Sequence, residues 1–148
     1  MNLYFRKAVV DDIPLLISLE ESARDLKVYS GTYSRDEWTE ELKIGVVYII
    51  ERNGVPVGDV MYEKKSEGYF YIDKILVLPE HQGQGIAKIA MEYILSEIRE
   101  AKRIDLVTHP ENNKAVNLYA SLGFAIESRK EDYFGDGEPR IVMVKIRD

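Results

Sequence analysis

The sequence predicts a mixed α/β (α+β) fold, a twisted mixed sheet of six to seven strands with helices on both faces. Three observations support this prediction. The chain has 148 residues and no linker, repeat or low-complexity segment, so we expect a single domain over residues 1–148. Segments with strand periodicity alternate with segments of helical periodicity. Three strands in the first half follow one another directly, whereas a helix connects later strands, so antiparallel and parallel pairing must coexist.

The N-terminal third reads as one strand and two helices. Leu3–Val9 is the strand, and Asp11–Pro14 begins a helix, with an Asp cap and a proline in the first turn. Apolar residues then recur at helical spacing: Leu15, Leu16, Leu19 and Ala23. Ser34–Glu37 has the capping-box pattern, which predicts a second helix over Asp36–Lys43. Between the helices lies a polar loop, Lys27–Tyr33.

The middle of the chain reads as a three-stranded antiparallel meander. Val46–Arg52 is followed by Asn53–Gly54, the favoured two-residue hairpin turn. Val57–Lys65 returns as the next strand, and a second glycine turn leads into Tyr69–Val77. A proline two residues later ends this third strand, because proline has no backbone N–H to donate to a neighbouring strand.

The C-terminal half reads as helix, strand, helix and a final hairpin. The first helix has an apolar stripe: Ile86, Ile89, Ala90, Tyr93, Ile94 and Ile98. Ile104–Thr108 is a short apolar strand. The apolar face of the second helix is Ala115, Leu118, Tyr119 and Leu122, and Gly123 stands at its C-terminal cap. Ala125–Tyr133 and Ile141–Ile146 are the last two strands.

Composition limits the partners of the protein. The formal net charge of -6 argues against general nucleic-acid binding and suits a cationic substrate, although mild acidity also serves solubility. No apolar run is long enough to span a membrane, and the start lacks signal-peptide features, so we expect a cytoplasmic protein. There is no cysteine, and His81 and His109 are far apart, so no metal site is expected. An exposed edge strand near either terminus would allow a homodimer.

A glycine-rich segment separates the third meander strand from the following helix. Gly83 and Gly85 let backbone N–H groups approach an anion, and the helix dipole adds partial positive charge there. Lys88 is one turn into the helix and can add a charge-assisted bond. On this evidence alone a phosphate site and an ordinary glycine turn both remain open. No Gly-Lys-Ser/Thr follows, so the segment is not a P-loop, and it lacks the third glycine of the dinucleotide fingerprint.

Two motifs together resemble the GNAT family of N-acetyltransferases. Gln82–Ala87 is similar to its acyl-CoA signature, Arg/Gln-x-x-Gly-x-Gly/Ala, and the preceding Ile75–Glu80 looks like the family's fourth strand. Asn112–Phe124 resembles the second motif, Asn-x-x-Ala-x-x-Leu-Tyr-x-x-x-Gly-Phe. The motifs occur in the family's order and element types. The resemblance therefore implies a GNAT fold over the whole chain.

The same resemblance implies acetyl-CoA as cosubstrate and assigns residues to it. The exposed backbone of the fourth strand should bind the pantetheine arm, through Ile75, Leu76 and Val77. Backbone N–H groups should hold the pyrophosphate, from Gly83, Gln84, Gly85, Ile86, Ala87 and Lys88. Gln82 opens this loop, and Asn112 should contact the pantetheine region.

The resemblance also implies a general acid, while the base stays open. Tyr119 matches the family tyrosine that protonates the leaving thiolate, although helical spacing alone would read it as a core residue. Asp73 and His109 are the candidate bases, and each also has a structural reading.

The acceptor is less narrowly defined than the cosubstrate. The segment Arg129–Met143 resembles the last hairpin of protein N-terminal acetyltransferases of the ribosomal-protein alanine type, which implies a substrate-covering role for Tyr133. Tyr29 and Tyr33 would form the opposite wall of a peptide entrance. Val107 stands where that subfamily commonly has a glutamate. The acceptor is therefore expected to be a peptide N-terminal amine. The alternative acceptor is a small amine such as a polyamine, an amino acid or an antibiotic-like amine. A further alternative for the whole protein is a non-catalytic acyl-CoA sensor.

Overall fold

The computed structural model describes all 148 residues and contains seven strands and four α-helices. The strands are β1 (Leu3–Lys7), β2 (Val46–Arg52), β3 (Val55–Ser66), β4 (Tyr69–Val77), β5 (Arg103–Thr108), β6 (Ala125–Lys130) and β7 (Arg140–Ile146). The helices are α1 (Ile13–Glu21), α2 (Arg35–Ile44), α3 (Ile86–Glu97) and α4 (Asn113–Ser121). Short 3₁₀ turns precede α1 (Val10–Asp12) and α3 (Pro79–His81). This element order confirms the predicted fold class.

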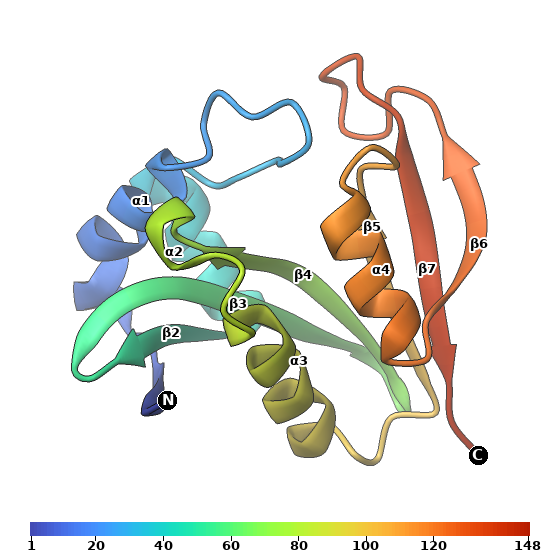
Figure 1. Cartoon of the computed structure of the whole chain (residues 1–148), viewed down its shortest axis with the longest axis horizontal. Helices are drawn as coiled ribbons and strands as arrows, with labels where there is room; N and C mark the ends of the chain where they lie inside the picture. The colour runs from blue at the N-terminus through green and yellow to red at the C-terminus, as the bar shows by residue number, and fades with distance from the viewer.

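The seven strands form one mixed sheet in the order β1-β2-β3-β4-β5-β7-β6 (Figure 1). β1 to β4 are an antiparallel meander, β4 and β5 are parallel, and β5, β7 and β6 pair antiparallel. β4 is thus the last strand of one antiparallel half, and β5 is the first strand of the other. The two halves are joined only through the parallel ladder between β4 and β5.

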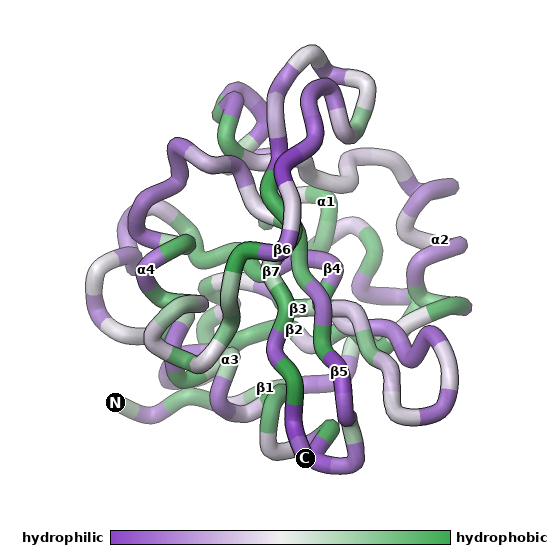
Figure 2. The backbone as a smooth tube through the Cα atoms, turned by 90° about the vertical axis from the view of Figure 1, so that its right-hand side faces the viewer, coloured by the Kyte–Doolittle hydropathy of each residue, from purple (hydrophilic) through white to green (hydrophobic).

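A separate hydrophobic core covers each face of the sheet. The larger core packs α3 and α4 against one face, around Ile94, Ile104 and Tyr119. The smaller core packs α1 and α2 against the other face, around Leu16, Trp38 and Ile49. Figure 2 shows hydrophobic segments concentrated along the central strands, whereas most peripheral loops are hydrophilic. No helix is both long and apolar enough to cross a membrane.

β4 contains a bulge that changes which side chains face each core. Ile72 pairs with Tyr62 of β3, but Lys74 pairs with Met61, so Asp73 is the extra residue on β4. Phe70, Ile72 and Val77 belong to the larger core, whereas Leu76 belongs to the smaller one. Strict alternation would place residues 70, 72, 74 and 76 on one face. A bulge also bends the strand and increases its twist, and here it lies where β4 parts from β5.

The last hairpin differs from the sequence prediction. The strand expected over Ala125–Tyr133 ends at Lys130, and Tyr133 lies in the loop before β7. Asp132 has a left-handed φ of 51°, a conformation that cannot continue a strand. The side chain of Asp132 accepts a hydrogen bond from the N–H of Gly137 at 2.6 Å, which closes the loop on itself.

Candidate active site

The cavity begins where β4 and β5 separate. Their parallel ladder runs from Tyr69–Arg103 to Ile72–Leu106, and no residue of β4 beyond Ile72 pairs with β5. Past this point the β5-facing edge of β4 lacks a neighbouring strand, so its backbone N–H and C=O groups are available to a ligand. Residues 75–77, expected to bind a pantetheine arm, lie on this stretch.

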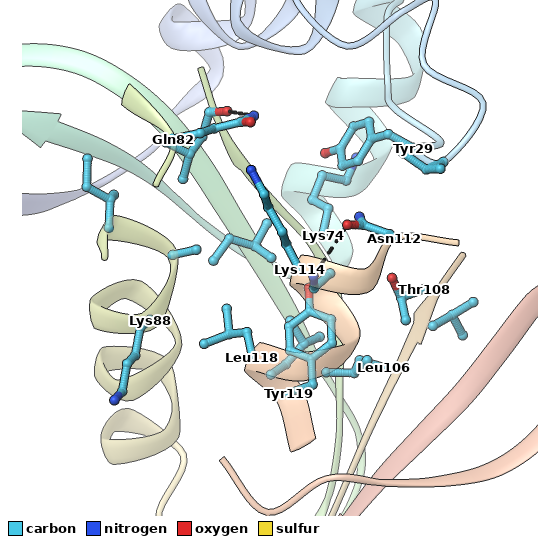
Figure 3. Close-up of a pocket in the computed structure, with 18 of the residues that line it drawn as sticks. Tyr29, Lys74, Gln82, Lys88, Leu106, Thr108, Asn112, Lys114, Leu118 and Tyr119 are labelled. Carbon is cyan, nitrogen blue, oxygen red and sulfur yellow. Dashed lines mark hydrogen bonds between the residues drawn. The ribbon is translucent and has the colours of Figure 1, made fainter. Parts of the chain in front are cut away.

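A cavity of about 340 Å³ occupies the opening (Figure 3). Its walls come from β4, β5, the starts of α3 and α4, the loop between α1 and α2, and the loop between β6 and β7. Many residues predicted for the site line it: Tyr29, Asp73, Ile75, Val77, Gln82, Gly83, Gly85, Ile86, Ala87, Lys88, Asn112 and Tyr119. Other predicted site residues do not: Tyr33, Leu76, Gln84, His109 and Tyr133.

The glycine loop has the geometry of an anion site. Gly83 and Gly85 have φ values of 77° and 85°, in the left-handed region that favours glycine. A Cβ at either position would meet no atom within 4 Å, so the space beside the loop is open. Gly85 is the N-cap of α3 and supplies no side-chain cap, which leaves the first-turn N–H groups of the helix uncapped by a side chain. These N–H groups and the helix dipole suit a phosphate.

The polar side chains around this loop differ in what they do. The Gln82 amide donates to the carbonyl of Val77 at 2.9 Å, so it fastens the loop to the end of β4 (Figure 3). Gln84 accepts instead from Arg52, away from the cavity. In Figure 3 the exposed Lys88 side chain extends along α3 away from the loop, whereas Lys114 extends from α4 into the cavity toward Gln82. Lys114 is therefore a cation of the site that the glycine-loop pattern did not indicate.

The start of α4 positions two predicted residues. Asn112 caps α4 by accepting from the N–H of Ala115 at 3.3 Å. The Tyr119 side chain is only 8% exposed, and its phenol lies near Leu106 and Leu118 at the cavity wall (Figure 3). Burial raises the pKa of Tyr119 to about 12, so the hydroxyl keeps its proton throughout the neutral range. A neutral phenol in this position can donate a proton to a ligand in the cavity.

Asp73 lies on the bulge and lines the cavity. Burial, followed by a hydrogen bond with the Glu63 carboxyl of β3, raises the pKa of Asp73 to about 9. The same hydrogen bond lowers the pKa of Glu63, whose carboxylate also pairs with Lys65 at 3.0 Å. The two carboxyls therefore share one proton, and at neutral pH that proton resides mainly on Asp73.

His109 has both ring nitrogens engaged outside the cavity lining. Nε2 lies 2.7 Å from the Glu138 carboxylate, and Nδ1 accepts from the N–H of Glu111 at 3.0 Å. These bonds join the β5–α4 loop to the β6–β7 loop and assign the neutral tautomer with the proton on Nε2. Ligand atoms of these three residues lie within 4.8 Å of one another, a spacing that a metal ion would accept, but the hydrogen bonds already account for it. We therefore do not retain His109 as a candidate base.

The three tyrosines expected around the acceptor entrance occupy different environments. Tyr29 lines the cavity and donates its hydroxyl to Glu20 at 3.0 Å. The ring of Tyr33 lies 4.3 Å from the guanidinium of Arg24 and does not line the cavity. Tyr133 is 39% exposed and does not line it either.

Further cavity-lining residues were missed by the sequence analysis. Phe134 lines the wall where Tyr133 was expected; the two rings pack edge to face at 4.8 Å. Arg140, nearly fully buried, stands 5.2 Å from the Phe134 ring and pairs with Asp136 at 3.0 Å. Lys74 reaches the cavity from β4, and its ammonium pairs with Glu41 of α2 at 3.1 Å. No periodic pattern in the sequence marks these three positions as cavity-lining. Whether they face the cavity depends on the bulge in β4 and on the conformation of the loop between β6 and β7.

Comparison with known proteins agrees with this geometry. The family model described as "Acetyltransferase (GNAT) family" matches residues 16–124. Spermidine N(1)-acetyltransferase of Escherichia coli is 31% identical over 103 residues, which cover 66% of this chain and 48% of that protein. UPF0157 protein YqkA of Bacillus subtilis is 32% identical over 73 residues, which cover 49% of this chain and 21% of that protein. The chain thus spans about half or less of the length of these curated relatives.

Two solved structures show how widely the same fold recurs. The ribosomal-protein-S18-alanine N-acetyltransferase of Escherichia coli has a TM-score of 0.82 at 18% identity, covering 98% of this chain and 94% of that one. A chain of the NatC complex bound to Gag peptide and CoA has a TM-score of 0.81 at 20% identity, covering 100% of both chains. At these identities the likeness concerns the fold alone.

Proposed function

The chain belongs to the GNAT family of acetyltransferases, and from this premise we propose that it transfers the acetyl group of acetyl-CoA to a primary amine. One observation carries the proposal. The uncapped start of α3, the unpaired edge of β4 and the Tyr119 phenol all border one cavity. An anion site, a row of backbone hydrogen-bonding groups and a proton donor in this order match the pyrophosphate, pantetheine arm and thioester of acetyl-CoA.

The residues of the cosubstrate side divide by chemical task. The N–H groups between Gly83 and Lys88 would hold the pyrophosphate, with Lys114 adding positive charge from the opposite wall. The edge of β4 beyond Asp73 would orient the pantetheine arm. Tyr119 would then donate its proton to the sulfur that leaves, and its burial keeps that proton available in the neutral range.

The acceptor must reach the cavity as a neutral amine before it can attack. At pH 7, about one in ten molecules of an α-amine with a pKa of about 8 is neutral, against about four in ten thousand for a lysine-like amine of pKa about 10.4. Asp73 holds its own proton at neutral pH, so it offers little basic help there. This favours an acceptor that is already partly neutral, and we propose a protein or peptide N-terminal α-amine.

The acceptor-side walls suit such a peptide. Tyr29, Ser30 and Phe134 come from two facing loops and combine apolar surface with hydroxyl groups. A peptide backbone presents the same mixture of apolar and hydrogen-bonding atoms. The similarity to spermidine N(1)-acetyltransferase supports a second candidate, a polyamine. Net charge of -6 agrees with attraction of either cation.

An acceptor panel tests the proposal. The purified protein is mixed with acetyl-CoA and with short peptides that begin in alanine, serine or methionine, or with spermidine or free amino acids, and release of CoA is measured. We expect release with a peptide. Release with spermidine alone would assign the polyamine function instead. CoA binding without release for any amine would contradict catalysis and indicate an acyl-CoA sensor.

The cytoplasmic location and the homodimer remain predictions from the sequence.

A further inference from the structure

A pair of buried carboxyl groups lies behind the acceptor wall of the cavity and has no part in the chemistry described above. Glu20 of α1 and Asp59 of β3 are both fully buried. Two buried carboxylates cannot both remain ionised at close range without strong repulsion. The pair therefore needs an explanation beyond packing.

Hydrogen bonds show how the pair divides its protons. Glu20 accepts from the Tyr29 hydroxyl at 3.0 Å and from the N–H of Thr32 at 3.2 Å. Asp59 has no donor for either oxygen. Burial of an ionised carboxylate without a donor is strongly disfavoured, so Asp59 keeps its proton, and Glu20 with its two donors is the ionised member of the pair. The pair then carries one negative charge, placed on the residue that contacts Tyr29.

Charged groups from every neighbouring element act on this pair. The positive charge of Lys74 on β4 lowers the pKa of Glu20 and so favours its ionised form. The negative charge of Glu41 on α2 raises the pKa of Asp59 and so favours its protonated form. Burial, the largest cause, raises the pKa of Glu20 and of Asp59. Burial and the charge on Glu20 also raise the pKa of Tyr29 well above its usual value, so Tyr29 stays a neutral phenol.

Tyr29 connects this pair to the cavity. Its hydrogen points inward to Glu20, so only oxygen lone pairs remain for a group in the cavity. Tyr29 and Tyr119 line the same cavity, from the α1–α2 loop and from α4 (Figure 3). An amine placed to attack a thioester beside Tyr119 can therefore donate an N–H to Tyr29.

We propose that Glu20 and Asp59 act through Tyr29 as the proton acceptor for the amine substrate at neutral pH. An ammonium N–H bond breaks, its electron pair stays on nitrogen, and the proton passes to the Tyr29 oxygen. The Tyr29 hydroxyl proton moves to Glu20 in the same step. The result is a neutral amine, an unchanged tyrosine and a fully protonated carboxyl pair, which returns the proton by the same route once the product has left. This inference rests on the proposed N-acetyltransferase function.

The test compares Tyr29→Phe with Tyr4→Phe across a range of pH. The acceptor is an alanine-initiated peptide, with spermidine as a second arm, and kcat/KM for the acceptor is measured beside KM for acetyl-CoA. We expect Tyr29→Phe to reduce kcat/KM by on the order of 10²-fold at neutral pH. The loss should shrink as the pH passes the amine pKa of about 8 for the peptide, because the substrate is then neutral without help. Tyr4 is 63% exposed on β1 and does not line the cavity, so Tyr4→Phe should change neither quantity.

Other outcomes overturn the inference. A loss that is equal at all pH values would make Tyr29 a binding residue only, and no loss beyond that of Tyr4→Phe would remove it from the reaction. Glu20→Gln should reproduce the pH-dependent loss; where this variant unfolds, Tyr29→Phe decides alone. Failure of the wild-type protein to acetylate any amine would instead contradict the proposed function itself.

Discussion

Burial controls the proton affinity of the Tyr119 phenol and thereby its proposed role. Tyr119→Phe removes one hydroxyl and keeps the ring that packs against Phe124. We expect kcat to fall on the order of 10²-fold while the affinity for CoA, measured by calorimetry, stays nearly constant. Leu118→Ala, also at the cavity wall, is a packing control that retains the hydroxyl. Turnover unchanged by Tyr119→Phe would show that the leaving sulfur obtains its proton elsewhere.

The shifted pKa of Asp73 makes opposite predictions for stability and activity. The folded-state pKa of about 9 exceeds the usual value of 3.8, so ionisation opposes folding and stability is lost as the pH rises between these values. Asp73→Asn removes that penalty, and we expect Tm at neutral pH to rise by a few degrees with little change below about pH 4. Thermal unfolding at both pH values measures this.

The same substitution should alter the pH profile of the enzyme. Wild-type kcat/KM should keep rising toward about pH 9 as Asp73 ionises, whereas Asp73→Asn should lose that last increase. Equal profiles for the two proteins would exclude Asp73 as a base. A lower Tm for Asp73→Asn would show that the interaction of Asp73 with Glu63 stabilises the fold by more than the burial of the Asp73 carboxyl destabilises it.

At the scale of a structural element, the glycine loop before α3 has a left-handed backbone conformation and is also the proposed phosphate site. Gly85→Ala places a Cβ at φ 85°, which costs about 1 kcal/mol and puts a methyl group in the space proposed for phosphate. We expect CoA affinity to fall at least several-fold. Gly54→Ala is a matched control, since Gly54 has φ 80°, an equally open surrounding and no place in the cavity lining. Gly54→Ala should lower stability similarly and leave CoA affinity unchanged; a similar loss of affinity in both variants would contradict the loop assignment.

The bulge in β4 is the element-scale feature that creates the site. It moves Lys74 and Leu76 to the α1–α2 face, while Ile75 and Val77 stay with the larger core. The pairing with β5 ends at Ile72, directly before the bulge, so one edge of the strand is exposed beyond that residue. The spacing of three residues between Ile72 and Ile75 on the core face is the sequence signal that could have revealed it.

At the scale of the whole molecule, the cavity lies between the two halves of the sheet. Residues from β4 and α3 form one wall, and residues from β5 and α4 form the other. A ligand that contacts both walls binds only the folded protein, so it raises stability by mass action. Acetyl-CoA at about 100 times its Kd should add about 2.7 kcal/mol, or about 5–10 °C in Tm for a chain of this size.

This stabilisation is measured by thermal unfolding over a titration of acetyl-CoA, with Gly85→Ala as the variant of weakened affinity. The wild-type curve should shift at lower ligand concentration than the variant curve. Absence of any shift at millimolar acetyl-CoA would contradict cosubstrate binding and favour a purely structural domain.

Local chemistry was enough to predict most of the fold. Capping residues, turn glycines and two hydrophobic periodicities act over a few neighbours, so the order of helices and strands followed from the sequence. The glycine loop and the positions of Asn112 and Tyr119 were predictable for the same reason, because a motif is a local pattern on one element. The family model then confirmed the resemblance on which the acyl-CoA site rested.

Only the tertiary structure decided which side chains meet in the cavity. The spacing of Tyr29, Tyr33 and Tyr133 in the sequence does not distinguish them, yet one lines the cavity and two do not. Glu20 and Asp59 are 39 positions apart and gave no motif. Their contact depends on α1 packing over β3, and a contact between distant segments is created by packing of the whole chain rather than by preferences of neighbouring residues.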